Sequence, residues 1–109
     1  MKTVFMVHSN PVKDREQEFN NWYTNVHLRE VLQIDGFISA QRFKLAAAQV
    51  INNQPYNYLA LYEIDSENIT QTLKNLAGAS DLQMSDAIDS ASMQISVFDS
   101  IHDKMLVAS

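Results

Sequence analysis

Hydrophobic and polar residues recur along this chain in patterns that predict four strands and two helices. Each strand segment is rich in β-branched and aromatic side chains and ends near a turn signal such as Asn10-Pro11. The clearest segment, YNYLALYEI, is apolar on both faces, which favours a strand covered on both sides. The predicted strands span residues 1–9, 37–45, 56–64 and 93–101.

A first helix is predicted after residue 14, where Asp14 is placed as N-cap and acidic residues occupy the first turn. At about 100° per residue, one arc of this helix carries five residues, namely Phe19, Trp22, Tyr23, Val26 and His27. The next apolar residues fall on a different arc. We therefore expect the helix to bend or break near Leu28 and to stop at Asp35-Gly36.

A second helix begins after Asp65-Ser66 and ends at Gly78. Residues 46–55 fit a connection between two strands, although their Ala-rich start is also compatible with helix. Residues 79–92 are small and polar, which predicts a mobile or partly helical surface segment that could cover a pocket as a lid. For the tail from His102, the sequence is compatible both with an extension of the last strand and with a free arm.

This order predicts an α+β, ferredoxin-like βαββαβ fold, with a four-stranded antiparallel sheet and helices on one face only. The other sheet face would then leave apolar side chains in water. Exposed apolar patches of that size usually mark an interface. A twofold homodimer in which two sheets close face to face into an α+β barrel would cover them.

Composition narrows the classes of protein. The 109 residues, 46% of them hydrophobic and 19% charged, predict one domain over residues 1–109. The chain has no cysteine, which excludes disulfides, thiolate metal sites and a cysteine nucleophile. A net charge of −5 without a basic run argues against nucleic acid and membrane partners. No apolar stretch has signal-peptide or membrane-span length, so we expect a cytoplasmic protein.

Three motifs resemble a known family. They are Trp22-Tyr23 followed by His27, then the segment DGFISAQRF from Asp35, and then YLALYE from Tyr58. Their order and spacing resemble the dimeric α+β barrel superfamily, and within it the EthD-like proteins, named after an ethyl tert-butyl ether degradation protein. The resemblance extends from residue 2 to about residue 100.

The resemblance implies the fold and the homodimer, but it does not imply one reaction. The superfamily includes cofactor-free monooxygenases, polyketide cyclases, muconolactone isomerases and haem-degrading enzymes. In EthD-like proteins the histidine that follows the Trp-containing helix commonly faces the cavity. For this chain, the resemblance therefore implies that His27 faces a cavity.

His27 is the first candidate for chemistry, because imidazole suits proton transfer near neutral pH. It shares its helix arc with aromatic side chains, so it should point toward the sheet. The alternative is a packed histidine that caps a backbone carbonyl where the helix breaks. Glu30, three residues on, could orient the ring, or it could pair with Arg29 at the surface, which is the simpler interpretation.

Tyr62 and Arg42 are candidate electrophilic or oxyanion partners of His27. The Tyr62 phenol could donate a hydrogen bond to a substrate carbonyl. Arg42 lies in a strand, where it could anchor an acid or enolate oxygen, or pair with Glu63 on the adjacent strand. The ion pair is the simpler account.

Four aromatic residues are candidate walls of a substrate pocket between the first helix and the sheet. Ordinary core packing also explains each of them. They are Phe19, Trp22, Tyr23 and Tyr58.

The sequence contains no spacing of histidines and acids that suits a metal, and no Gly-rich phosphate loop. We therefore expect no metal and no cofactor. The leading hypothesis is a cofactor-independent enzyme (isomerase, cyclase, dehydratase or lyase) that acts by acid–base chemistry on an apolar, carbonyl- or phenol-bearing small molecule. The alternatives are a non-catalytic ligand-binding or accessory dimer, a cofactor-free monooxygenase, and a structural dimer.

Overall fold

The structure, a computed structural model, describes residues 2–65 and 67–108, and its strands form one antiparallel sheet in the order β2-β3-β1-β4. This order matches the predicted ferredoxin-like arrangement. Each strand lies within the predicted segment or close to it. The strands are β1 (Thr3–Ser9), β2 (Phe37–Lys44), β3 (Tyr58–Ile64) and β4 (Gln94–Asp99).

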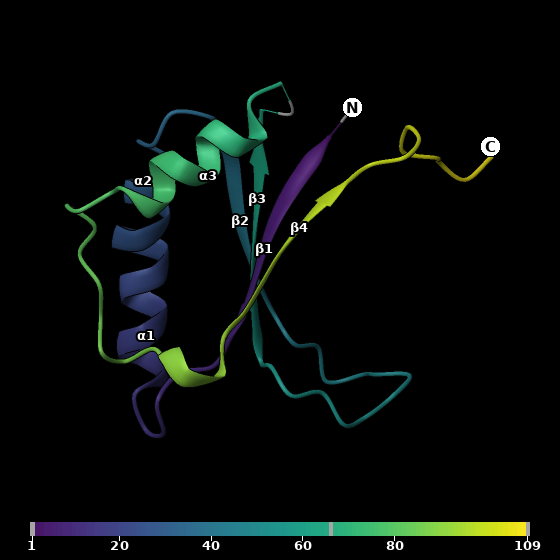
Figure 1. Ribbon diagram of the computed structural model, residues 1–109. Coiled ribbons are helices and arrows are strands. Elements are labelled where there is room, and N and C mark those ends of the chain that lie inside the picture. The colour runs from purple at the N-terminus through teal and green to yellow at the C-terminus, as the bar shows by residue number, and fades with distance from the viewer. Residues whose placement is uncertain (1, 66, 109) are drawn as a thin grey trace.

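The helices lie together on one side of the sheet, and the other side is left open (Figure 1). The first is a continuous helix that changes type along its length: α1 (Glu16–Trp22), a π-helical turn η1 (Tyr23–His27) and α2 (Leu28–Val31). The second helix is α3 (Ile69–Ala77), and a short 3-10 turn, η2 (Ser90–Ser92), precedes β4. The α+β fold class predicted from the sequence is confirmed.

The two central strands, β1 and β3, alternate strictly between buried and half-buried residues. Their helix-facing side chains form the core, in which the rings of Phe5, Phe37 and Tyr62 contact one another edge to face at centroid distances of 5.7–5.9 Å. The side chains that point to the open face are only half-buried. The open face is therefore apolar along its centre, at Val4, Met6, Leu59 and Leu61.

Gly36 sits where the first helix turns into β2, with φ of 103°. A Cβ atom at this position would lie 1.8 Å from Oγ1 of Thr72, which is itself buried on α3. Glycine is therefore required twice here, by its backbone conformation and by the close approach of α3. This contact fixes α3 against the start of β2.

The start of the first helix differs from the prediction. Asp14 has φ of 66°, in the left-handed region, so it is not the N-cap. The helix begins at Glu16, and Arg15 occupies the cap position without a side-chain cap. The guanidinium of Arg15 instead binds the carboxylates of Glu18 and Asp86, which ties the helix start to the segment after α3.

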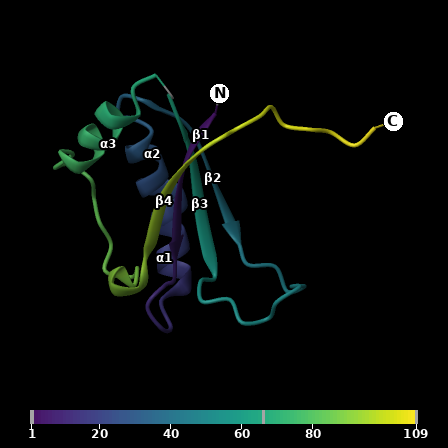
Figure 2. The same cartoon turned by 45° about the vertical axis from the view of Figure 1, so that its right-hand side comes forward.

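The segment 79–92 is also more integrated than predicted. It runs beside the first helix down to η2 (Figures 1 and 2), and Ala87 and Ile88 are buried in the core. Backbone hydrogen bonds join it to the chain before α1: Val12 N–H donates to Ala87 O at 2.6 Å, and Asp89 N–H donates to Asn10 O at 2.9 Å. The prediction of a surface segment is therefore wrong at Ala87 and Ile88, and η2 supplies the predicted partly helical character.

The connection between β2 and β3 is a loop, as predicted, and it extends beyond the sheet at the end opposite α3 (Figure 1). At the other end of the chain, the residues after β4 extend away from the sheet and expose Ile101 and Val107 (Figure 2). Within the part of the chain that the structure describes, no helix has the length and apolar character needed to cross a bilayer.

Candidate functional site

The π-helical turn places His27 against the sheet side of the first helix. Leu28 N–H donates to Tyr23 O, five residues back, so the helix contains one widened turn. The imidazole of His27 stacks on the indole of Trp22 at 4.7 Å and meets the ring of Tyr23 edge-on at 5.1 Å. Single π-turns of this kind occur frequently at functional sites.

A cavity of about 100 Å³ lies between this turn and the sheet. Four of the residues predicted for the site line it together, which places the predicted pocket between first helix and sheet: His27, Tyr62, Trp22 and Tyr23. Their neighbours in the lining are all apolar. They are Phe5, Val7, Val31, Leu76, Met84, Ile88, Met93 and Ile95.

His27 is half-buried, and burial lowers the pKa of its imidazole, while the nearby carboxylate of Glu30 acts to raise it. Its Nδ1 atom is buried and has no hydrogen-bond partner among the described residues. The ring is therefore not capping a backbone carbonyl through Nδ1, as the packing alternative would require. A neutral imidazole with a free nitrogen can accept or donate a proton.

Tyr62 and Tyr23 are buried phenols that both line this cavity. Burial raises the pKa of both, most strongly that of Tyr62, and the nearby Arg42 opposes this effect. Both phenols therefore stay protonated at neutral pH. Protonated phenols in an apolar cavity are hydrogen-bond donors for a carbonyl or enolate oxygen.

Arg42 lies outside this cavity, on the other side of Tyr23. Its guanidinium carbon is 4.5 Å from the ring centroid of Tyr23 and 5.2 Å from those of Phe19 and Tyr58. The side chain donates to Asn20 Oδ1 at 2.9 Å and to Thr24 Oγ1 at 3.0 Å. Burial lowers its pKa, and Nε is buried without a partner among the described residues.

The alternative pairing of Arg42 with Glu63 is wrong. Arg42 faces the helices in register with Ala60, whereas Glu63 is on the open face and lies 3.5 Å from Lys2 Nζ. A register shift between Phe37 and Ser39 sets which β2 side chains face the helices. The structure therefore divides the predicted site residues into two groups. One group lines the cavity with His27, and the other, Phe19 and Tyr58, packs around Arg42. Tyr23 belongs to both groups.

One residue of the segment 79–92, Gln83, is held through both its backbone N–H and its backbone C=O by the helix that carries His27. Trp22 Nε1 donates to Gln83 O at 2.6 Å, and Gln83 N–H donates to Glu30 Oε1 at 2.8 Å. Glu30 is thus engaged with Gln83, and no ion pair links it to Arg29 among the described residues. We call these two bonds the Gln83 clamp; they close the segment over the cavity beside Met84.

The sequence did not identify the apolar residues that complete the cavity. Met84 and Ile88 are scattered in a polar stretch, where no periodicity marks them, and Met93 stands at the start of the predicted last strand. Their isolated apolar character was the only signal available. In the described ranges, no group of three His, Cys, Asp or Glu side chains is placed to hold a metal ion.

Solved structures share this fold. An EthD family protein from Bacillus halodurans c-125 superposes with a TM-score of 0.58 at 12% identity, covering 93% of this chain and 100% of that one. A proposed monooxygenase from Shewanella loihica PV-4 gives a TM-score of 0.59 at 10% identity, covering 94% and 99%. These similarities confirm the EthD-like fold expected from the sequence motifs.

No functionally curated protein matches the chain. The model of one family, a domain of unknown function designated DUF4286, matches residues 2–85. This range contains the first helix, His27, Tyr62 and the Gln83 clamp. The chain belongs to the DUF4286 family and carries an EthD-like α+β fold.

Proposed function

We propose that this protein is a small cofactor-independent enzyme that moves protons on an apolar molecule bearing a carbonyl or a phenol. Isomerisation, cyclisation, dehydration and lyase reactions all belong to this class. One observation carries the proposal: His27, whose buried Nδ1 has no partner among the described residues, lines the same cavity as the phenols Tyr62 and Tyr23.

The proposed step for an isomerisation balances without a cofactor. Neutral His27 takes a proton from the carbon next to the substrate carbonyl, and the electron pair of that C–H bond moves into an enolate. Tyr62 donates a hydrogen bond to the enolate oxygen, where negative charge develops. His27⁺ then returns the proton to another carbon, and the product has the composition of the substrate.

The cavity of about 100 Å³ is smaller than the roughly 300–1,000 Å³ typical of ligand pockets. Entry of a substrate therefore requires the segment around Gln83 and Met84 to move. The Gln83 clamp is the proposed latch, because its two hydrogen bonds hold this segment against Trp22 and Glu30. Such lid motions commonly accompany catalysis in closed sites.

We also propose that two copies pair through the open face of the sheet. Outside the end of the sheet where the loop between β2 and β3 begins, its apolar side chains are half-buried at Val4, Met6 and Leu61 and exposed at Phe98. A second copy would remove this surface from water, and in a twofold pair the open faces of both copies would be buried together.

The function is tested by proton exchange in D2O. Small cyclic and aromatic ketones are incubated with the protein, and loss of the α-hydrogen signal is followed by proton NMR. We expect exchange with at least one of them above the rate in buffer. Saturable binding without faster exchange with any ketone would overturn the enzyme proposal in favour of a non-catalytic binding protein.

The fold similarity to the proposed monooxygenase from Shewanella loihica PV-4 supports a second candidate. The same proton abstraction from a phenol or ketone yields an electron-rich carbon that molecular oxygen can oxidise. An oxygen electrode distinguishes the two reactions, because substrate-dependent oxygen consumption supports the monooxygenase and its absence supports proton transfer alone.

A further inference from the structure

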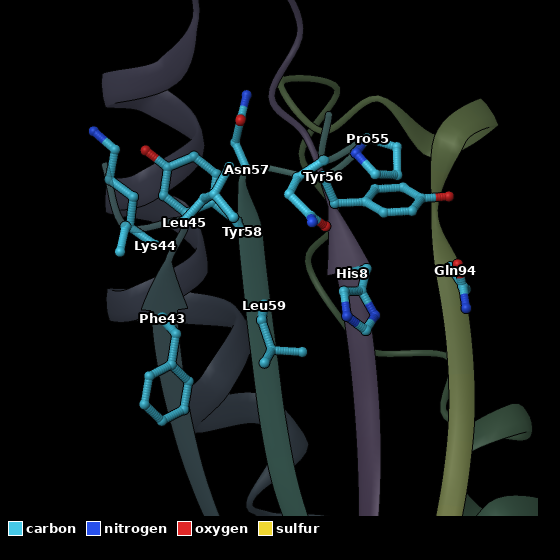
Figure 3. Close-up of a pocket in the computed structure, with 12 residues that line it drawn as sticks. His8, Phe43, Lys44, Leu45, Pro55, Tyr56, Asn57, Tyr58, Leu59 and Gln94 are labelled. Atoms are coloured by element: carbon cyan, nitrogen blue, oxygen red, sulfur yellow. The ribbon is translucent and has the colours of Figure 1, made fainter. Parts of the chain in front are cut away.

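A second hollow of about 410 Å³ lies on the open face of the sheet, where the loop between β2 and β3 joins the strands (Figure 3). We call it the open-face pocket. It shares no lining residue with the His27 cavity. Strand alternation separates the two sites: Val7 points to the cavity on the helix side, and His8 points to the open-face pocket.

The imidazole of His8 is the central polar group of this pocket. Its Nδ1 atom is buried and has no hydrogen-bond partner among the described residues. The ring of Tyr56 lies beside it at 5.6 Å, while Leu59 and Gln94 flank it on the neighbouring strands (Figure 3). A buried polar atom without a partner is unfavourable, and a ligand that bonds to it removes that penalty.

The wall that carries Tyr56 is held rigidly in place. Asn10 donates from Nδ2 to Pro55 O at 2.9 Å and accepts at Oδ1 from Asn57 N–H at 2.8 Å. The residues on both sides of Tyr56 are therefore fixed to the end of β1. A site whose walls are ordered before binding loses less entropy when a ligand enters.

The charge and shape of the lining indicate the kind of ligand. The chain has 13 acidic residues, yet none lines this pocket, and the charged residue in its lining, Lys44, points its side chain away from His8 (Figure 3). Flat apolar surface comes from Phe43 and Tyr56, with Leu59 between them on β3. The volume is that of an ordinary small-molecule site. This combination suits a planar anion.

We propose that the open-face pocket binds a small aromatic carboxylate. Its ring packs over Leu59 beside Tyr56, and its carboxylate accepts a hydrogen bond from the Nδ1–H tautomer of His8. This site does not depend on the function proposed for His27, because the two hollows are lined by different residues.

Titration of the ¹⁵N-labelled protein with benzoate tests the proposal, with benzyl alcohol as the uncharged probe and cyclohexanecarboxylate as the non-planar one. We expect saturable shifts at the amides of His8, Tyr56 and Gln94, and weaker binding of both comparison probes. The variants His8→Leu and Tyr56→Leu should each weaken benzoate binding by about tenfold or more. The control His102→Leu, in the exposed tail, should bind as the wild type does.

Three results would overturn the proposal. The first is the absence of saturable shifts with benzoate. The second is unchanged benzoate binding in both variants when both fold. If His8→Leu does not fold, unchanged binding in Tyr56→Leu alone has the same meaning. The third is that the same amide signals shift when the protein is concentrated without ligand and that benzoate causes no further shift. A second copy of the chain would then fill the pocket.

Discussion

The indole of Trp22 and the imidazole of His27 stack at 4.7 Å with their planes 25° apart, although the residues are five positions apart. In a regular α-helix, residues five apart point about 140° away from each other. The π-helical turn at Tyr23–His27 removes most of this angle. The widened turn thus places the candidate acid–base group against the residue that holds the Gln83 clamp.

The variant Trp22→Phe separates the two roles of the indole, which are packing on His27 and donating a hydrogen bond to Gln83. The phenyl ring can still pack on His27, but the Nε1 donor to Gln83 O is lost. We expect faster hydrogen exchange in residues 79–86, with little change in the exchange of β3, as followed by mass spectrometry.

Asn25→Ala, an exposed position on the same turn, is the matched control and should leave the exchange of residues 79–86 unchanged. Equal exchange in Trp22→Phe and wild type would show that the clamp does not hold the segment.

The pKa of His27 should lie below the ordinary histidine value, because burial disfavours the imidazolium. Glu30→Gln should lower it further, since it removes the negative charge that acts to raise it. Titration of the imidazole C–H signals by NMR measures both values. A rise in the pKa in Glu30→Gln would contradict the assigned electrostatics.

The lowered pKa of His27 also makes the free energy of unfolding depend on pH. Below about pH 6.5 the unfolded chain protonates His27 before the folded protein does, so wild type loses stability as pH falls toward the folded pKa. In His27→Gln this contribution is absent. Urea unfolding between pH 5 and 8 should therefore show the stability of wild type falling relative to the variant at acid pH; parallel curves would contradict it.

Pairing through the open face predicts a mass of about twice 12.4 kDa by light scattering after size exclusion. Leu61→Asp places a charge at the centre of the face and should give a monomer. Val50→Asp, on the fully exposed loop, is the control and should stay dimeric. A monomeric wild type at tens of micromolar would refute the pairing.

Gly36→Ala should destabilise the protein by about 2–4 kcal/mol, from backbone strain and from collision with Thr72. Gly78→Ala is the control: its φ is negative, and the added Cβ would approach Lys74 O only to 3.4 Å. Thermal unfolding of both variants measures the difference. Similar melting temperatures would show that the contact at Gly36 can relax.

The sheet could be predicted because alternation in the sequence and burial in the fold have the same period. Phe5, Val7, Tyr62 and Ile64 all point to the helices as their spacing requires. The helical arc likewise brought Tyr23 and His27, four residues apart, to one cavity, and the π-turn added Trp22. These are local patterns, which the sequence states directly.

The remaining features depend on contacts between distant segments. The order of apolar and polar residues in the first helix carries no mark of the π-turn, because the same residues would also fit a regular α-helix. The predicted pairing of Arg42 with Glu63 fails because the sequence does not reveal which face of β2 meets the helices. The Gln83 clamp joins residues 53 and 61 positions apart, and neither bond has a sequence signal.

In the proposed function, His27 transfers protons in the helix-side cavity. The most direct test of this step is the rate of α-hydrogen exchange of a small aromatic ketone in D2O, measured for wild type and His27→Gln at equal concentrations of folded protein. We predict a loss of about 10²–10⁴-fold in the variant, with melting temperatures that stay close. Equal rates in the two proteins, or no acceleration by wild type with any ketone, would contradict the account.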